Sequence, residues 1–448
     1  MTGFGLIILL VSAIALMILL INKAKLHPFL AILVAAYVFA IVGGVSLNEV
    51  DTVIRKGFGG LLTYIGIVIT LGTIIGLILE KSGAAVTMAK VALKTFGKRN
   101  PSLAIGFVGW LVSIPVFCDS GFVILSPLKK SIAKATKSSM VTMTIALSVG
   151  LYASHTLVPP TPGPIAAAGN LGIENALGMV ILIGIVVSVF ALFAGYLYAR
   201  FIGKKIDDSE LDLTIDEELA QEQYGELPSA FKSFMPIILP IILISIGTII
   251  NLPTKPLGEG LVYQILNFIG KPATALFIGT FLSLPLLKGS NAKFDKIVAD
   301  GVKMAAPILL ITAAGGAFGA AIKATPVADY IGSSLSGISL GLVVPFIIAA
   351  ALKTAQGSST TALVVTSSIM APLLPSLGLA GTMGAVLTVM AIGAGAMTVS
   401  HSNDSYFWVV TQTTGMSAST GYKTQTIASL IMGLVSLVVT LILGFILL

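Results

Sequence analysis

Long apolar stretches alternate with short polar ones along almost the whole chain. The clearest apolar runs lie at 3–21, 29–45, 61–79, 237–250 and 427–448. As helices, such runs cross a hydrocarbon core of roughly 30 Å. They should be helices because an open sheet edge leaves backbone groups unpaired in lipid. The run at 3–21 has no basic segment before it and no cleavage motif, and Lys23 and Lys25 follow it. We therefore interpret it as a retained membrane span and not as a cleaved signal peptide.

Composition places the chain in a membrane. Apolar residues make up 56% and charged residues 10% of the sequence, and the mean hydropathy is +1.02. The net charge of +7 comes from basic residues in short loops, which membrane topology explains without a nucleic-acid partner. Cys118 is the single cysteine, so no intramolecular disulfide is expected. The three histidines form no His-x-x-x-His pair, so we expect neither a metal site nor a cofactor.

Polar interruptions recur in the two halves. His155 and His401, each preceded by a serine, lie 401 − 155 = 246 residues apart, inside otherwise apolar sequence. Glycines recur at similar offsets: Gly72 and Gly76 with Gly315 and Gly319, and Gly121 with Gly357. We therefore predict two copies of one unit, with the repeated interruptions meeting at a central site.

A long hydrophilic segment at 204–232 separates the two copies. It holds nine acidic residues, namely Asp207, Asp208, Glu210, Asp212, Asp216, Glu217, Glu218, Glu222 and Glu226. We interpret it as a solvated linker on the cytoplasmic side and not as an interaction tail. The first repeat is then 1–203 and the second is 233–448.

The basic loops predict how the chain crosses the membrane. Lysines and arginines at 90–99 and 129–137 should both be cytoplasmic. The segment 101–128 must therefore enter and leave on one side, as a re-entrant hairpin whose partner in the second half is 340–373.

Two helices should also be broken at mid-membrane, at about 139–170 and 380–412. Each half then has about five crossings plus one hairpin, and an odd number inverts the second copy relative to the first. The predicted fold is an all-α polytopic membrane protein of two inverted repeats, with about ten crossings and both termini periplasmic or extracellular.

The interruptions predict the chemistry of the site. A helix broken inside the membrane exposes free N–H groups that attract an anion. Glycine and hydroxyl residues permit close approach and neutral hydrogen bonds, which suits a small polyhydroxylated carboxylate. The predicted substrate-binding residues are Asp119, Ser120, Gly121, Ser154, His155, Thr156, Thr161, Lys353, Thr354, Gln356, Gly357, Ser358, Ser359, His401, Ser402 and Asn403.

Three of the titratable residues are candidates for proton coupling: Asp119, Asp404 and His155. A charge at the bilayer centre costs about 3 kcal/mol, so it needs a partner or a purpose. The alternatives are that Asp404 caps a helix, that Asp119 hydrogen-bonds its own turn and that the histidine only packs. Lys353 either pairs with the substrate carboxylate or lies at a hairpin mouth.

From about residue 3 to the C-terminus, the chain resembles the gluconate permeases, which are proton symporters for sugar acids within an ion-transporter superfamily. The motifs are Pro159-Pro160-x-Pro162-Gly163-Pro164, Gly121-Phe122-Val123, Gly357-Ser358, and Ser400-His401-x-Asn403-Asp404 followed by Phe407-Trp408. The resemblance implies an inverted-repeat fold and uptake of a hydroxylated monocarboxylate with protons across the bacterial inner membrane. The chain departs from members that resemble dedicated gluconate carriers, which have His at Thr161 and Arg at Lys353. A glycerate-like acid or a hydroxylated amino acid such as serine therefore stays open as the substrate.

We expect a secondary active transporter that works by alternating access, with a proton as the coupling ion and sodium as the alternative. A membrane-embedded hydrolase fits less well because no oriented third residue accompanies either Ser-His pair. A channel fits less well because the polar residues cluster at breaks and form no continuous stripe. The expected partners are a small carboxylate and the lipid bilayer, with a homodimer left open.

Overall fold

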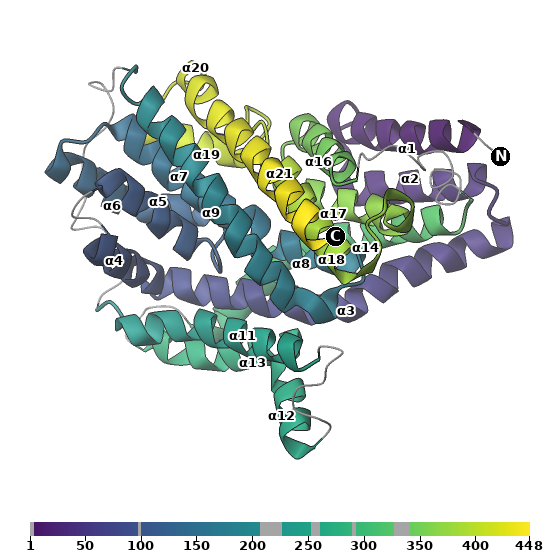
Figure 1. The fold of residues 1–448 in the computed structure, drawn as a ribbon, viewed down its shortest axis with the longest axis horizontal. Helices are drawn as coiled ribbons and strands as arrows, with labels where there is room; N and C mark the ends of the chain where they lie inside the picture. Colours follow the sequence, from purple (N-terminus) through teal and green to yellow (C-terminus); the bar gives the residue numbers. More distant parts are fainter. Residues whose placement is uncertain (1–3, 97–99, 207–225, 252–259, 289–292, 327–340) are drawn as a thin grey trace.

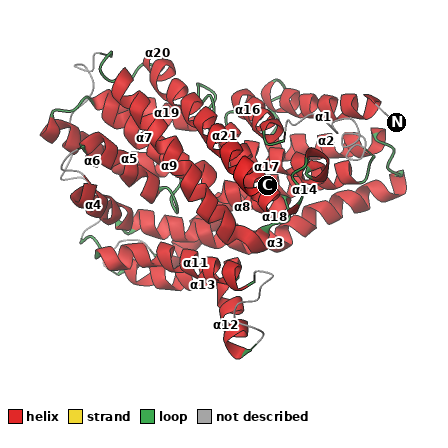
Figure 2. Ribbon diagram, in the orientation of Figure 1, coloured by secondary structure: helices red, strands yellow, loops and turns green. Residues whose placement is uncertain are grey.

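The computed structural model describes the chain except residues 1–3, 97–99, 207–225, 252–259, 289–292 and 327–340. Every regular element in this described part is a helix (Figure 1, Figure 2). In the first half these are α1 (Phe4–Asn22), α2 (Pro28–Val42), α3 (Leu47–Lys81), α4 (Ala84–Phe96), α5 (Pro101–Val112), α6 (Cys118–Thr136), α7 (Met140–Leu157), α8 (Pro162–Asn170), η1 (Glu174–Ala176) and α9 (Leu177–Ile202).

The second half has α11 (Ala230–Ile250), α12 (Leu261–Gly270), α13 (Pro272–Ser283), η2 (Leu284–Leu287), α14 (Phe294–Lys323), α16 (Val343–Gln356), α17 (Ser359–Met370), η3 (Ala371–Leu373), η4 (Pro375–Leu377), α18 (Gly381–Met397), α19 (Ser405–Thr414), α20 (Ala418–Gly421), η5 (Tyr422–Thr426) and α21 (Ile427–Leu447). Most of the predicted acidic linker, and the start of the predicted second hairpin, lie outside the described residues.

Several helices are long and apolar enough to cross a membrane. Among the described residues there are five such segments, namely Met140–Asn170, Glu174–Ile202, Ala230–Ile250, Phe294–Lys323 and Ala418–Leu447. Two pairs bent by 44° and 70°, within 47–81 and 261–287, raise the number to seven. The prediction of an all-helical, multi-pass membrane protein is confirmed. The count of about ten crossings stays a prediction, because the other apolar helical segments counted among the described residues, Ile8–Ile21 among them, are only 10–17 residues long.

Short turns and breaks separate several of the apolar helices. α5 and α6 pack on each other across the turn that contains Pro115, and α16 and α17 do so across Gly357. The helical path from Met140 to Asn170 is interrupted between α7 and α8, and the path from Gly381 to Thr414 is interrupted between α18 and α19. α6 continues to Thr136, beyond the end expected for the first hairpin.

The packing around these elements recurs in the two halves. α5 packs on α7 and α7 on α9, as α16 packs on α18 and α18 on α21 (Figure 1). A side chain at Gly150 of α7 would meet Gly106 O at 1.9 Å, and one at Gly395 of α18 would meet Phe346 O at 2.3 Å. These two glycines lie 395 − 150 = 245 residues apart, close to the spacing of the histidines. Each half therefore uses a glycine to bring the first arm of its hairpin against its broken helix.

The broken elements also cross between the halves. α6 of the first half packs on α19 of the second, and α17 of the second packs on α8 of the first. The long helices α3 and α14 cross each other at Gly57 and Gly316, where the ideal Cβ of Gly57 would lie 2.5 Å from Gly316 O. α3 runs between this central assembly and the pair α11 and α13, and α12 extends away from the body (Figure 1). Helices that flank the interruptions of one half therefore pack on helices that flank those of the other.

Candidate functional site

The turn between α16 and α17 is fixed by three consecutive residues. Gly357 ends α16 with φ 84°, a left-handed conformation that glycine adopts without a side-chain clash. Ser358 caps α17, where its Oγ accepts from the backbone N–H of Thr361 at 3.2 Å. The Gln356 amide donates to Ser358 O at 2.6 Å and accepts from Ser358 N at 3.1 Å. Local sequence chemistry thus sets the geometry of this turn.

The break between α18 and α19 is organised by Asp404. Its Oδ1 accepts from Tyr406 N at 3.0 Å, which caps α19. Its Oδ2 accepts from Ser400 Oγ at 2.5 Å, and Ser400 N donates to Ser429 Oγ at 2.9 Å. The carboxylate therefore holds both sides of the break and does serve as a helix cap.

A buried ion pair joins the turn to the break. Lys353 Nζ lies 2.6 Å from Asp404 Oδ2, and the two side chains are 0% and 6% exposed. The ammonium also donates to Gly357 O and lies 5.7 Å from the centre of the Tyr152 ring. Lys353 thus lies at neither an open hairpin mouth nor a surface. A buried pair of this kind is costly to form, so its presence inside an apolar assembly makes this place the candidate site.

The tip of the second hairpin, which is the turn between α16 and α17, packs directly against this break. His401 Nε2 and Asn403 Nδ2 both donate to the carbonyl oxygen of Thr354, at 2.9 and 2.8 Å. Gly357 lies so close to Asn403 that a Cβ there would be 2.0 Å from Asn403 O. Ser402 and Asn403 are exposed, and His401 is half-buried. This side of the site is therefore open to the surroundings, whereas the ion pair beneath it is closed off.

The first hairpin contributes Asp119 from the first turn of α6. Asp119 is half-buried, and its Oδ1 accepts from Ser405 Oγ at 3.3 Å, across the boundary between the halves. The neighbouring Cys118 Sγ donates to its Oδ2 at 3.8 Å. In the described part of the chain, no basic side chain forms an ion pair with Asp119.

Two buried polar atoms of α7 face this assembly without a hydrogen-bond partner among the described residues. They are His155 Nδ1 and Tyr152 Oη, on side chains that are 6% and 1% exposed. His155 packs against the Phe117 ring at 5.9 Å and lies within electrostatic range of Lys353 and Asp404. The Tyr152 hydroxyl interacts electrostatically with the Ser359 side chain, without the geometry of a hydrogen bond. Buried polar groups are nearly always paired, so the unpaired His155 Nδ1 beside an ion pair indicates a place for a polar ligand.

The other predicted residues of the first half use their hydroxyl groups locally. Ser154, Thr156 and Thr161 are buried, and they donate to Gly150 O at 3.5 Å, Tyr152 O at 3.1 Å and Val158 O at 2.6 Å. Gly121 is buried with its Cα facing Leu151, whereas Ser120 next to it is half-buried. Their roles in binding stay predictions.

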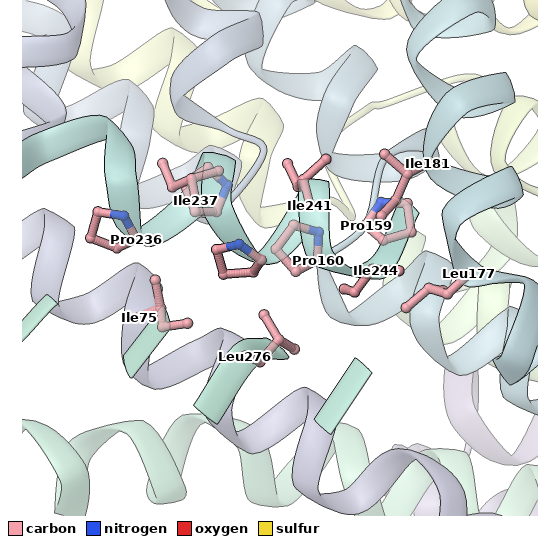
Figure 3. A pocket seen from close by; sticks show the side chains of 12 residues that line it. Ile75, Pro159, Pro160, Leu177, Ile181, Pro236, Ile237, Ile241, Ile244 and Leu276 are labelled. Atoms are coloured by element: carbon pink, nitrogen blue, oxygen red, sulfur yellow. The ribbon is translucent and has the colours of Figure 1, made fainter. Parts of the chain in front are cut away.

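The break of the first half has an apolar side. Pro115, Pro159 and Pro160 pack with Pro236 and Pro240 of α11 around a cavity of about 10 Å³ (Figure 3). Aliphatic side chains line the rest, namely Ile75, Leu177, Ile181, Ile237, Ile241, Ile244 and Leu276. The polar chemistry is thus concentrated at the second-half break, and the first-half break packs against α11 and α13.

Sequence reasoning missed Tyr152 and Ser405. Tyr152 precedes His155 by three residues, so both lie on one face of α7, and that spacing was the available signal. No sequence signal connects Ser405 to Asp119, because their contact depends on how α6 packs on α19.

Broken helices from both halves surround a buried ion pair and polar atoms that lack a hydrogen-bond partner among the described residues, inside an apolar assembly. These features define the class of protein: a helical membrane transporter. The chain belongs to a permease family, described as "GntP family permease", which it matches over residues 4–446. The resemblance found in the sequence motifs is confirmed. The protein is accordingly a permease of small molecules and not an enzyme.

Named relatives differ in their solutes. The chain is 30% identical over 439 residues to the gluconate permease of Pseudomonas aeruginosa, covering 96% of each protein. It is 34% identical over 443 residues to the D-serine transporter DsdX of Escherichia coli K12, covering 98% of each. The crystal structure of the YdaH transporter of Alcanivorax borkumensis superposes with a TM-score of 0.63 at 14% identity, covering 94% of this chain and 99% of that one, which shows a shared fold.

Proposed function

We propose that this permease takes up a small hydroxylated monocarboxylate, gluconate-like or glycerate-like, together with protons by alternating access. One observation carries the proposal: the buried pair of Lys353 and Asp404 lies beside the unpartnered Tyr152 and His155 at the meeting point of the helix breaks. An ammonium group recognises a carboxylate, and hydroxyl and imidazole groups recognise hydroxyls. A hydroxylated amino acid such as serine is the second candidate, supported by the relationship to a D-serine transporter.

We assign the predicted residues, together with Tyr152, to two layers. Lys353, Ser359, Tyr152 and His155 contact the substrate in the buried layer, and Asp404 binds the coupling proton. The residues at the hairpin tip and break line the entrance, because most of them are exposed or half-buried: Thr354, Gln356, Ser358, His401, Ser402 and Asn403. Asp119 remains the alternative proton carrier.

We further propose that residues 1–203 and 233–448 are inverted repeats, each with one re-entrant hairpin. The recurring packing of α5 on α7 and of α16 on α18 supports this organisation. The basic residues of α6 and its following loop support a cytoplasmic location for that end. The acidic linker then lies in the cytoplasm and both termini outside, in the inner membrane of a bacterium, and a homodimer stays an open expectation.

Uptake into proteoliposomes tests the proposal. Labelled D-gluconate, D-glycerate and D-serine are offered under an inward pH gradient, under an inward sodium gradient and under neither. We expect saturable accumulation of one of the two sugar acids that requires the pH gradient and is abolished by a protonophore. Accumulation driven by sodium alone would replace the proton assignment, and selective uptake of D-serine would replace the substrate.

An imposed potential then gives the stoichiometry. One monocarboxylate entering with one proton moves no net charge, so potential adds no driving force. A second proton adds about 2.3 kcal/mol per 100 mV. Unlabelled solute inside the vesicles must also drive labelled solute inward against its own gradient, because a channel lets each solute move only down its gradient.

A further inference from the structure

The position of Lys353 imposes a condition on any anion that enters the site. Its ammonium is fully buried and already has a carboxylate partner in Asp404, at 2.6 Å. Its other contacts are the carbonyl oxygen of Gly357 and the face of the Tyr152 ring. The pair together has no net charge. A second carboxylate brought beside it would leave one buried negative charge without a counter-ion, which is strongly disfavoured.

Asp404 can become neutral and still keep its hydrogen bonds to both sides of the break. When protonated, its Oδ1 still accepts from Tyr406 N, which keeps the cap on α19. Its Oδ2 then carries the proton and donates it to Ser400 Oγ, the atom from which it now accepts at 2.5 Å. The bond to Lys353 is the one contact that the neutral acid gives up. Protonation thus frees the ammonium and leaves the break folded.

We propose that the substrate carboxylate and the Asp404 carboxylate compete for Lys353. An anion then binds in the site only when Asp404 carries a proton. This inference rests on the proposed proton-coupled carriage. The incoming carboxylate takes the place of Asp404 on Lys353 Nζ, and the hydroxyl groups of the anion meet Tyr152 Oη and His155 Nδ1. The His155 Nδ1 atom is the independent sign of a ligand, because it is buried and has no hydrogen-bond partner among the described residues.

The same geometry separates two classes of substrate. A zwitterionic amino acid can replace both members of the pair at once, with its carboxylate on Lys353 and its ammonium on Asp404. The site then stays neutral without a proton. A sugar acid has no ammonium and requires the neutral acid. Binding of gluconate should therefore take up a proton, whereas binding of D-serine should not.

Other titratable groups near Asp404 do not fulfil this role. They are Cys118 and Asp119 of α6, Tyr152 and His155 of α7, and Tyr406 of α19. Protonating Asp119 would release no cation, because in the described residues it pairs only with the Ser405 hydroxyl and the Cys118 thiol. Of this group, Asp404 alone shares an ion pair with Lys353 among the described contacts.

Proton uptake on binding tests the competition directly. The purified full-length protein is placed in weakly buffered solution with a pH-indicator dye, and D-gluconate or D-serine is added. We expect uptake of about one proton per bound gluconate and none per bound D-serine. The affinity for gluconate should fall about tenfold per pH unit on the alkaline side.

The variant Asp404→Asn keeps an acceptor for the cap and fixes the neutral state. We expect it to bind gluconate without proton uptake and without the alkaline decline in affinity. In proteoliposomes it should exchange labelled for unlabelled gluconate but no longer accumulate it on a pH gradient. Lys353→Met should abolish binding of both probes.

A matched control is Asp51→Asn, which removes a carboxylate from an exposed pair with Arg55 at 2.8 Å, far along α3. It should behave as the wild type. If Asp404→Asn does not fold, Asp404→Ser replaces it, because a serine hydroxyl carries no charge and can still accept the cap hydrogen bond from Tyr406 N.

The outcomes are distinct. If Asp404→Asn still takes up a proton with gluconate, the competition is wrong and another group carries the proton, while proton-coupled carriage stands. Proton uptake with D-serine equal to that with gluconate would also refute it. If the wild-type protein binds neither probe and no D-glycerate, or binds gluconate without a proton, the proposed function itself fails.

Discussion

Replacing Gly357 by alanine tests how closely the tip of the second hairpin packs against the break between α18 and α19. Gly357 has φ 84°, and a Cβ built there would lie 2.0 Å from Asn403 O and 2.6 Å from Asn403 C. The left-handed conformation costs a residue with a side chain about 1–2 kcal/mol. Overpacking against backbone, which has no rotamer to change, costs a further ~1–3 kcal/mol. The variant should therefore lose about 2–5 kcal/mol of stability.

Gly378→Ala is the matched control for the conformational part. Gly378 also has a positive φ, 70°, but no atom lies within 4 Å of its ideal Cβ. It should lose only the left-handed cost of about 1–2 kcal/mol. The difference between the two variants then measures the contact between the hairpin tip and the break.

The assay is unfolding in a denaturing detergent. Because the chain has two tryptophans, it uses a Trp110→Phe background and follows the fluorescence of Trp408. That indole donates to Ser402 O at 2.8 Å, so it reports on the break itself. Uptake by Gly357→Ala should also fall, because separating the tip from the break pulls Lys353 away from Asp404. If the two glycine variants are equally stable and equally active, the hairpin tip is not seated on the break and the site described here is wrong.

Two further substitutions test contacts between the halves. Asn170→Ala should cost about 1–2 kcal/mol in the same assay, because its amide donates to Val364 O at 3.0 Å and to Ser367 Oγ at 2.8 Å. No loss would mean that α8 and α17 hold together by apolar packing alone. Lys129→Met should leave stability unchanged or raise it by about 1 kcal/mol, because the fully buried ammonium donates to Thr414 Oγ1 at 3.0 Å but has no ion pair among the described residues. A clear loss of stability would show that this bond outweighs the cost of burying the charge.

Much of the fold follows from local sequence. Between residues 139 and 170 the structure has two helices, α7 and α8, and between 380 and 412 α18 ends and α19 begins. That these breaks lie at mid-membrane stays a prediction. The hairpin turn at Gly357 was predicted from its glycine and hydroxyl residues and forms there. These features depend on residues close in sequence, where proline, glycine and capping hydroxyls act on their own backbone. The helix that contains the apolar run 61–79 begins earlier, at Leu47, because polar residues extend α3 beyond the apolar stretch.

The site could be predicted only in part. Asp404 and Lys353 were recognised as unusual charges in apolar surroundings, and the structure pairs them although 51 residues separate them. The hydroxyls of Ser154, Thr156 and Thr161 seemed equally suited to bind a ligand, but each donates to a carbonyl of its own segment. A hydroxyl can satisfy its own helix or a ligand, and sequence does not distinguish the two.

The sequence by itself determined that the chain is a helical membrane protein with repeated, broken elements, because hydropathy and backbone-breaking residues act locally. Only the tertiary structure decided that Lys353, the buried lysine of the second hairpin, is paired with Asp404. It also decided that Tyr152 and His155 lie beside this pair without a hydrogen-bond partner among the described residues. The physical reason is that hydrogen bonds and ion pairs are satisfied in space. Which charge meets which depends on the packing of helices far apart in the chain.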